Sequence, residues 1–132
     1  MTTTDLPEES DRFRRRYRLA GTNVLDEVEA EVIGVSFGAN GYTTAEQARD
    51  LTDRLDLSAG DLVLDVGGGR GWPSRYMQQL SSCNIVVTDP ILEGLEASNR
   101  VGERNPAAAC TGDKLPFRPS IFDAVVHSDV LC

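Results

Sequence analysis

The sequence has no apolar run approaching the ~20 residues that a membrane-spanning helix needs. Its first ten residues, MTTTDLPEES, are polar and acidic, which is unlike a secretory signal peptide. These absences predict a cytoplasmic protein that makes no membrane contact. The length of 132 residues fits one domain.

Cysteine is scarce, with three residues, and histidine occurs once. Cys83, Cys110 and Cys132 form no close pair, which argues against a disulfide framework or a zinc knuckle. We therefore expect reduced cysteines in or near the core, and we predict no metal site.

Basic residues are outnumbered, with 13 against 21 acidic residues and a net charge of −8. This balance disfavours broad binding to nucleic acid or to an anionic membrane. The segment DRFRRRYRL is an exception, because it holds five arginines. It either docks on an anionic partner or forms a solvated helix face balanced by the acidic run that follows, and we favour the second interpretation.

The N-terminal third has helical periodicity on both sides of a glycine-rich loop. Residues 1–9 are expected to form a disordered tail. Residues 22–35 are expected to form a helix with a buried stripe of Leu25, Val28, Val32 and Val35. After the loop SFGANGYTT, Thr43 or Thr44 caps a second helix, which turns inward Ala48, Leu51 and Leu55.

Beyond residue 60, short apolar runs alternate with helical segments. Strands are expected at 62–66, 85–87, 107–111 and 122–126, the first of them buried on both faces. One helix follows Pro73 and would bury Tyr76, Met77 and Leu80, and another spans 91–101. This alternation predicts parallel strands joined by helical crossovers, which is a Rossmann-like α/β sheet.

The loop after the first strand reads Asp65-Val-Gly67-Gly-Gly69-Arg-Gly71. A dinucleotide-binding G-x-G-x-x-G motif would need glycine at position 72, where this chain has Trp72. Asp65 would also repel a pyrophosphate, whereas a ligand with an ammonium group and a positive sulfur would tolerate or prefer it. S-adenosylmethionine is such a ligand, and glycines would let its amino-acid arm lie against bare backbone. The alternative is a glycine-rich turn that serves only to reverse the chain.

Two further acids follow the next two strands. Asp89 ends the second strand, where a carboxylate can accept hydrogen bonds from both hydroxyls of a ribose. Asp113 follows the third strand and could accept from an adenine amino group. Each acid alone is typical of an ordinary turn. Three acids at the ends of successive strands favour a shared site.

The segments LVLDVGGGRGWPS, IVVTDP and GDKLPFRPSIFDAVVHSDVL, in this order, resemble class I S-adenosylmethionine-dependent methyltransferases. The resemblance is greatest to the type 11 group, which includes quinone-biosynthesis methyltransferases, and it covers about residues 43–132. It implies a cofactor-binding Rossmann-like domain over 43–132 with strand order 3-2-1-4. Residues 1–42 would form a tail and a helical lid segment.

The resemblance also implies a set of cofactor-binding residues. Asp65, Gly67, Gly69 and Gly71 would hold the methionine part of the cofactor, and Asp89 its ribose. The adenine would lie beside Pro90 and Ile91, with its edge held by Asp113 and by backbone near Lys114 and Leu115. His127 and Ser128 would face the sulfonium end, and Tyr42 and Thr43 would close over the carboxylate. Methyl transfer needs no protein nucleophile, so no catalytic residue is assigned. A lone histidine such as His127 is more often structural than catalytic.

The chain departs from the family pattern in two places. Fewer residues than usual separate Asp113 from the Leu-Pro-Phe segment, and the sequence ends at Cys132, after the fourth of seven expected strands. That strand would be an edge with apolar side chains on both faces, which invites pairing with another chain. The chain is therefore expected to be a fragment, a unit completed by self-association or a partner, or a short binding module.

Three functions compete. The leading hypothesis is a methyltransferase, or the cofactor domain of one, that acts on a small-molecule acceptor. The second is a non-catalytic module that kept S-adenosylmethionine binding. The third, a nicotinamide-dependent oxidoreductase, is nearly excluded by Trp72.

Overall fold

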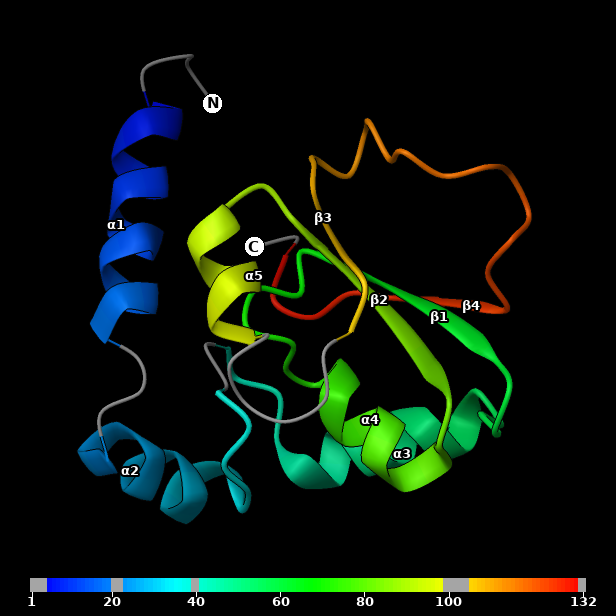
Figure 1. The fold of residues 1–132 in the computed structure, drawn as a ribbon. Coiled ribbons are helices and arrows are strands. Elements are labelled where there is room, and N and C mark those ends of the chain that lie inside the picture. Colours follow the sequence, from blue (N-terminus) through cyan, green and yellow to red (C-terminus); the bar gives the residue numbers. More distant parts are fainter. Residues whose placement is uncertain (1–4, 20–22, 39–40, 99–104, 131–132) are drawn as a thin grey trace.

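The computed structural model describes residues 5–19, 23–38, 41–98 and 105–130. Five helices and four strands are described (Figure 1). The helices are α1 (Asp5–Leu19), α2 (Asn23–Ile33), α3 (Ala45–Arg54), α4 (Ser74–Ser81) and α5 (Leu92–Ser98). The strands are β1 (Leu62–Val66), β2 (Asn84–Asp89), β3 (Ala107–Ala109) and β4 (Ala124–Val126). None of the described helices is long and apolar enough to cross a membrane.

The four strands form one parallel sheet in the order β3-β2-β1-β4. Val63 of β1 pairs with Ile85 of β2 on one side and with Ala124 of β4 on the other. The expected α/β class, parallel sheet and strand order are therefore confirmed. Because all strands run the same way, the carboxyl ends of β1, β2 and β4 meet at one edge, where the following loops gather.

The core lies between the helices and one face of the sheet. Val63, Ile85 and Val87 point from the strands toward Met77 of α4 and Leu95 of α5. A second cluster packs Trp72 and Tyr76 against Ala45 and Ala48 of α3, with the half-buried Ile33, Val35 and Phe37 beside it. The second cluster holds the chain that follows α2 against the helices that flank the glycine loop.

Helix α3 begins as the sequence predicts. Thr44 is its N-cap, and the side chains and backbone of Thr44 and Gln47 form a reciprocal capping box. Ala48 is buried and Leu51 half-buried, but Leu55 is exposed and was wrongly expected to face inward. Leu80 of α4 is exposed as well. Leu55 is the C-cap residue of α3, and Leu80 lies in the last turn of α4.

The N-terminal region differs from expectation in two ways. The predicted disordered tail over 1–9 is wrong from Asp5 onward, because α1 already begins there. The basic last turn, with Arg16 and Arg18, complements the dipole of this helix. The predicted stripe of α2 is wrong at Val28 and Val32, which are exposed, and Glu29 is buried instead. Val35 is half-buried in the second cluster, and the side chain of Leu25 lies outside the described part of the chain. Glu29 accepts a hydrogen bond of 2.7 Å from the Phe37 N–H, which ties this one acid to the segment after α2.

The arginine-rich segment forms the solvated face of α1, as the favoured interpretation predicts. Its arginines are exposed, while Tyr17 between them is buried against Gly94 of α5. Arg14 and Arg18 lie 3.6 Å from the Glu93 carboxylate at the start of α5. Figure 1 shows α1 lying beside α5, and these partly exposed ion pairs join the two helices.

Candidate functional site

The glycine loop joins β1 to α4 at the carboxyl edge of the sheet. Gly67, Gly69 and Gly71 all have positive φ angles, of 70°, 52° and 93°. Side chains other than glycine are strained in this region, so the three glycines that the sequence singles out are needed for the shape of the loop. The Gly68 N–H donates to Thr88 O at 2.9 Å, which fastens the loop to β2.

Asp65 lies at the end of β1 and is fully buried. Its Oδ2 accepts a hydrogen bond of 2.5 Å from the Ser74 hydroxyl, while its Oδ1 has no partner. Burial raises the pKa of Asp65 to about 7, the Ser74 hydrogen bond opposes this rise, and the nearby Asp89 charge adds to it. The result is a carboxyl group that titrates near neutrality and has one oxygen available to a donor.

Asp89 ends the neighbouring strand β2 and is also buried. Its Oδ2 accepts from the Gly69 N–H at 3.0 Å, and its Oδ1 accepts from the Ile91 N–H at 2.8 Å. Burial raises the pKa of Asp89, and the two backbone hydrogen bonds oppose the rise. Asp89 thus ties the glycine loop to the turn before α5, and each oxygen keeps lone pairs for a hydroxyl donor.

The loop between β3 and β4 carries the third acid. Asp113, Lys114 and Leu115 are all exposed there. Gly112 passes close to the end of β1, since a methyl group on it would lie 3.4 Å from Val66 Cγ1. The loop therefore reaches the strand edge, but the Asp113 side chain is not buried with Asp65 and Asp89. Of the two residues predicted beside an adenine, Ile91 is buried and Pro90 is exposed.

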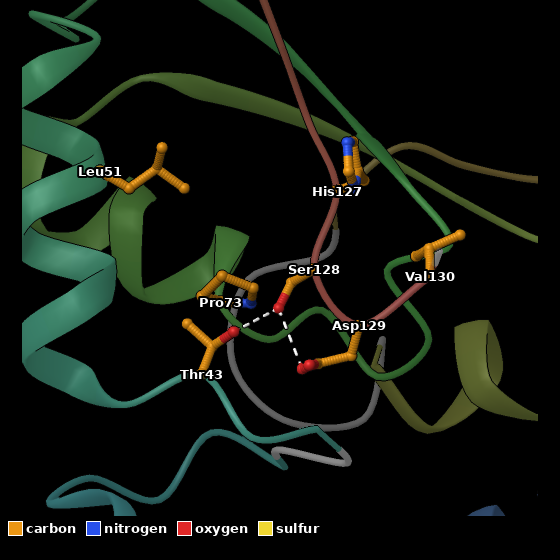
Figure 2. A pocket seen from close by; sticks show the side chains of 7 residues that line it. All are labelled: Thr43, Leu51, Pro73, His127, Ser128, Asp129 and Val130. Atoms are coloured by element: carbon orange, nitrogen blue, oxygen red, sulfur yellow. Dashed lines mark hydrogen bonds between the residues drawn. The ribbon is translucent and has the colours of Figure 1, made fainter. Parts of the chain in front are cut away.

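A cavity of about 400 Å³ lies beside the end of β4. Figure 2 shows its lining, in which Thr43 and Asp129 point toward Ser128. The Ser128 hydroxyl contacts the Thr43 hydroxyl and lies 3.1 Å from Asp129 Oδ2, which also accepts from the Tyr42 N–H. These contacts join the glycine-rich segment before α3 to the segment after β4.

The same cavity departs from expectation in its membership. It is lined by His127 and Ser128 but by none of the three acids. Val130 separates the cavity from the glycine loop, since a methyl group on Gly67 would lie 2.6 Å from Val130 Cγ2. The Tyr42 side chain is 91% exposed and covers nothing, so only the backbone of Tyr42 takes part.

Sequence reasoning assigned no place in the site to four residues that build this region. Gly68 fits between Asp65 and Val87, Ser74 holds Asp65, and the Trp72 indole N–H donates to Thr43 O at 2.8 Å. Arg70 is buried within the loop. A fourth glycine in the loop and an arginine among glycines were the signals that could have indicated two of them.

The free thiols and possible metal ligands add nothing to the site. Cys83 is buried and Cys110 is half-buried, both as free thiols, and Cys132 lies outside the described residues. In the described ranges, no three His, Cys, Asp or Glu side chains gather as metal ligands would. The chemistry of the site is that of bare backbone beside two buried carboxyl groups, which suits a ligand with hydroxyl and ammonium donors.

Comparison with known proteins gives one family match and several relatives. Residues 64–132 match the family model described as a methyltransferase domain. The chain is 31% identical over 88 residues to sterol 24-C-methyltransferase of Eremothecium gossypii, which is 62% of this chain and 24% of that protein.

Two solved structures share the fold. One is geranyl diphosphate methyltransferase, solved with GPP and sinefungin. It has a TM-score of 0.64 and 18% identity, and the match covers 89% of this chain and 55% of that protein. An S-adenosylmethionine-dependent methyltransferase from Thiobacillus denitrificans was solved with S-adenosyl-L-homocysteine. It has a TM-score of 0.54 and 18% identity, and the match covers 80% of this chain and 43% of that protein. The chain thus spans about a quarter of its curated relative and about half of these two structures.

Proposed function

The chain belongs to the methyltransferase domain family, and from that membership we propose that it binds S-adenosylmethionine at the glycine loop. It would serve as the cofactor-binding domain of a methyltransferase that acts on a small molecule. The observation that carries this proposal is the pair of buried acids, Asp65 and Asp89, at the ends of neighbouring strands beside a glycine loop with three positive φ angles.

The buried acids would divide the recognition of the cofactor between them. Asp65 has an unpaired oxygen for the ammonium group, and its partial ionisation near neutrality would be completed by that cation. Asp89 is fixed by two backbone donors and would accept the ribose hydroxyls with its remaining lone pairs. Ile91 and the loop at Asp113 to Leu115 would border the adenine.

When bound, S-adenosylmethionine supplies a methyl group on a positive sulfur, which an acceptor atom can displace in line. The chain would position that group and exclude water from it. Thr43, His127 and Ser128 line the cavity at the end of β4, on the side where an acceptor would approach. No residue of the chain is assigned as a general base.

The acceptor class is proposed from the charge of the chain and its relatives. A net charge of −8 does not suit a nucleic-acid substrate. The curated relative carries a sterol methyltransferase name, and one structural neighbour is named for geranyl diphosphate. We therefore propose a small-molecule acceptor with a substantial apolar part, in keeping with Leu51, Pro73 and Val130 in the cavity wall.

A partner chain is part of the proposal. Within the described sheet, β4 pairs only with β1, and Val125 on β4 is 58% exposed. An edge of this kind is open to pairing with a second copy or with another polypeptide. Residues 1–42 would act with that partner as a lid, since the segment before α3 is already joined to Ser128 and Asp129.

Calorimetric titration with S-adenosylhomocysteine, the product of methyl transfer, tests the proposal directly. We expect one saturable site per chain in the 132-residue protein. Asp89→Ala should weaken binding about 10- to 100-fold, the equivalent of about 1–3 kcal/mol for a lost hydrogen bond to a charged group. Asp53→Ala, at an exposed position of α3, is the matched control and should bind like the unchanged protein.

Two results would contradict this proposal. A folded protein that shows no heat of binding would make the glycine loop a structural turn only. An Asp89→Ala variant that keeps its thermal unfolding transition and its full affinity would remove Asp89 from the ribose site. Binding without turnover of any acceptor would instead favour the non-catalytic module.

A further inference from the structure

Two buried side-chain atoms in the described part of the chain have no hydrogen-bond partner, and they have opposite chemistry. One is Asp65 Oδ1, an acceptor, and the other is Arg70 Nε, a donor. Asp65 lies in β1 and Arg70 in the glycine loop that follows, five positions further on, with Gly67 and Gly69 between them. Unpaired buried polar atoms are rare in folded proteins, because each has lost its hydrogen bonds to water without a replacement.

Among the described residues, no acidic side chain pairs with Arg70 to explain its burial. Arg70 is 8% exposed and forms no ion pair with any described carboxylate. Glu29, the buried acid of α2, accepts from the Phe37 N–H instead. The positive charge of Arg70 adds to burial in lowering the pKa of Arg75, so positive charge is concentrated in this region.

The position of the guanidinium is fixed from both sides. Arg70 lies between Gly69 and Gly71, two of the positive-φ glycines of the loop. On the other side, the chain after α2 passes over it at Gly38, where an added methyl group would lie 2.7 Å from Arg70 Cζ. Gly38 has a φ of 74° and cannot be replaced without displacing the guanidinium. The guanidinium group of Arg70 is therefore held between the glycine loop and the segment over 36–38.

We propose that Arg70 binds the carboxylate of the amino-acid end of S-adenosylmethionine while Asp65 binds its ammonium group, so that one zwitterion satisfies both unpaired atoms. The inference rests on the proposed function and adds to it a specificity-determining residue. A planar guanidinium suits a carboxylate because two parallel N–H groups can meet its two oxygens. The ligand class selected is an α-amino acid attached to a thioether or sulfonium, rather than any adenosine derivative.

The test compares two ligands that differ only in the carboxylate. S-adenosylhomocysteine carries it, and 5′-deoxy-5′-(3-aminopropylthio)adenosine keeps the amine, sulfur and nucleoside without it. In calorimetric titration, Arg70→Met should weaken S-adenosylhomocysteine binding about 10- to 100-fold. The same substitution should leave the affinity for the decarboxylated ligand within about twofold.

Two further variants make the comparison specific. Arg75→Met is the matched control, because Arg75 is also a buried arginine but its guanidinium donates to Ser98 O at 2.9 Å. Any effect of Arg75→Met should be equal for the two ligands. Arg70→Lys keeps the positive charge but lacks the paired N–H donors of the guanidinium, so it should lose part of the S-adenosylhomocysteine affinity. This variant provides a test even where Arg70→Met does not fold.

The outcomes separate this inference from the proposed function. Equal losses for both ligands in the Arg70 variants would make Arg70 a structural residue and overturn the inference. Unchanged affinity for S-adenosylhomocysteine would overturn it too, and would point to an anion on the acceptor. Failure of the unchanged protein to bind S-adenosylhomocysteine would instead contradict the proposed function.

Discussion

Asp65→Asn is expected to raise the free energy of unfolding by up to about 4 kcal/mol at pH 8 and to change it little at pH 4. Asp65 has an ordinary pKa of 3.8 and a pKa of about 7 in the folded chain. Between these values the folded state holds a proton that the unfolded state has lost, so stability falls as the pH rises from about 4 to about 7. A pKa difference between 3.8 and about 7, at about 1.4 kcal/mol per pKa unit, corresponds to the expected gain of about 4 kcal/mol.

The asparagine keeps the shape of the aspartate and still accepts from the Ser74 hydroxyl through its own oxygen. Thermal or urea unfolding between pH 4 and 8 measures the effect, with Asp53→Asn at an exposed site as the control. The unchanged protein should lose stability over this range, and the Asp65→Asn curve should be flatter. Parallel curves for the two proteins would show that Asp65 is ionised in the folded state throughout.

The same variant separates stability from binding. S-adenosylhomocysteine affinity of the unchanged protein should rise with pH up to about 7, because its ammonium group favours the ionised Asp65. Asp65→Asn should bind about 10- to 100-fold more weakly and without this pH dependence. If Asp65→Asn is more stable but binds less well, Asp65 lowers the stability of the fold and contributes to ligand binding.

The sheet and the glycine loop were predictable because their signals are local. Residues 62–66 form an apolar run ending in an acid and glycines, and the structure places β1 at those residues. Positive φ at Gly67, Gly69 and Gly71 likewise follows from the one residue type that tolerates it. The third strand candidate was also local, although β3 is shorter than the predicted 107–111.

The remaining features depend on contacts between distant segments. Thr43 and Ser128 are 85 positions apart, and no local pattern places their hydroxyls together. The burial of Glu29 is determined by Phe37, a residue beyond the end of α2, so helical periodicity gave the wrong buried face. The sequence gives no local signal for the burial of Arg70, which lies beneath Gly38, a residue 32 positions earlier in the chain.

Gly68→Ala should lower the free energy of unfolding by about 3 kcal/mol or more, although position 68 needs no unusual backbone angle. A methyl group there would lie 2.6 Å from Asp65 Cγ and 2.7 Å from Val87 Cγ1. Both side chains are fully buried, so neither can move aside without displacing the β1–β2 pair. Thermal unfolding should show a midpoint lowered by roughly 8 °C or more.

Gly112→Ala is the matched control, because its methyl group would meet Val66 Cγ1 at 3.4 Å in an exposed loop. It should unfold within about 2 °C of the unchanged protein, since exposed substitutions cost about 0.5 kcal/mol or less. Equal thermal unfolding midpoints for Gly68→Ala and Gly112→Ala would show that the side chains of Asp65 and Val87 can move to make room for the added methyl group. The four glycines between residues 67 and 71 therefore have two physical origins. Three provide backbone angles, and the fourth leaves space for the buried side chains of Asp65 and Val87.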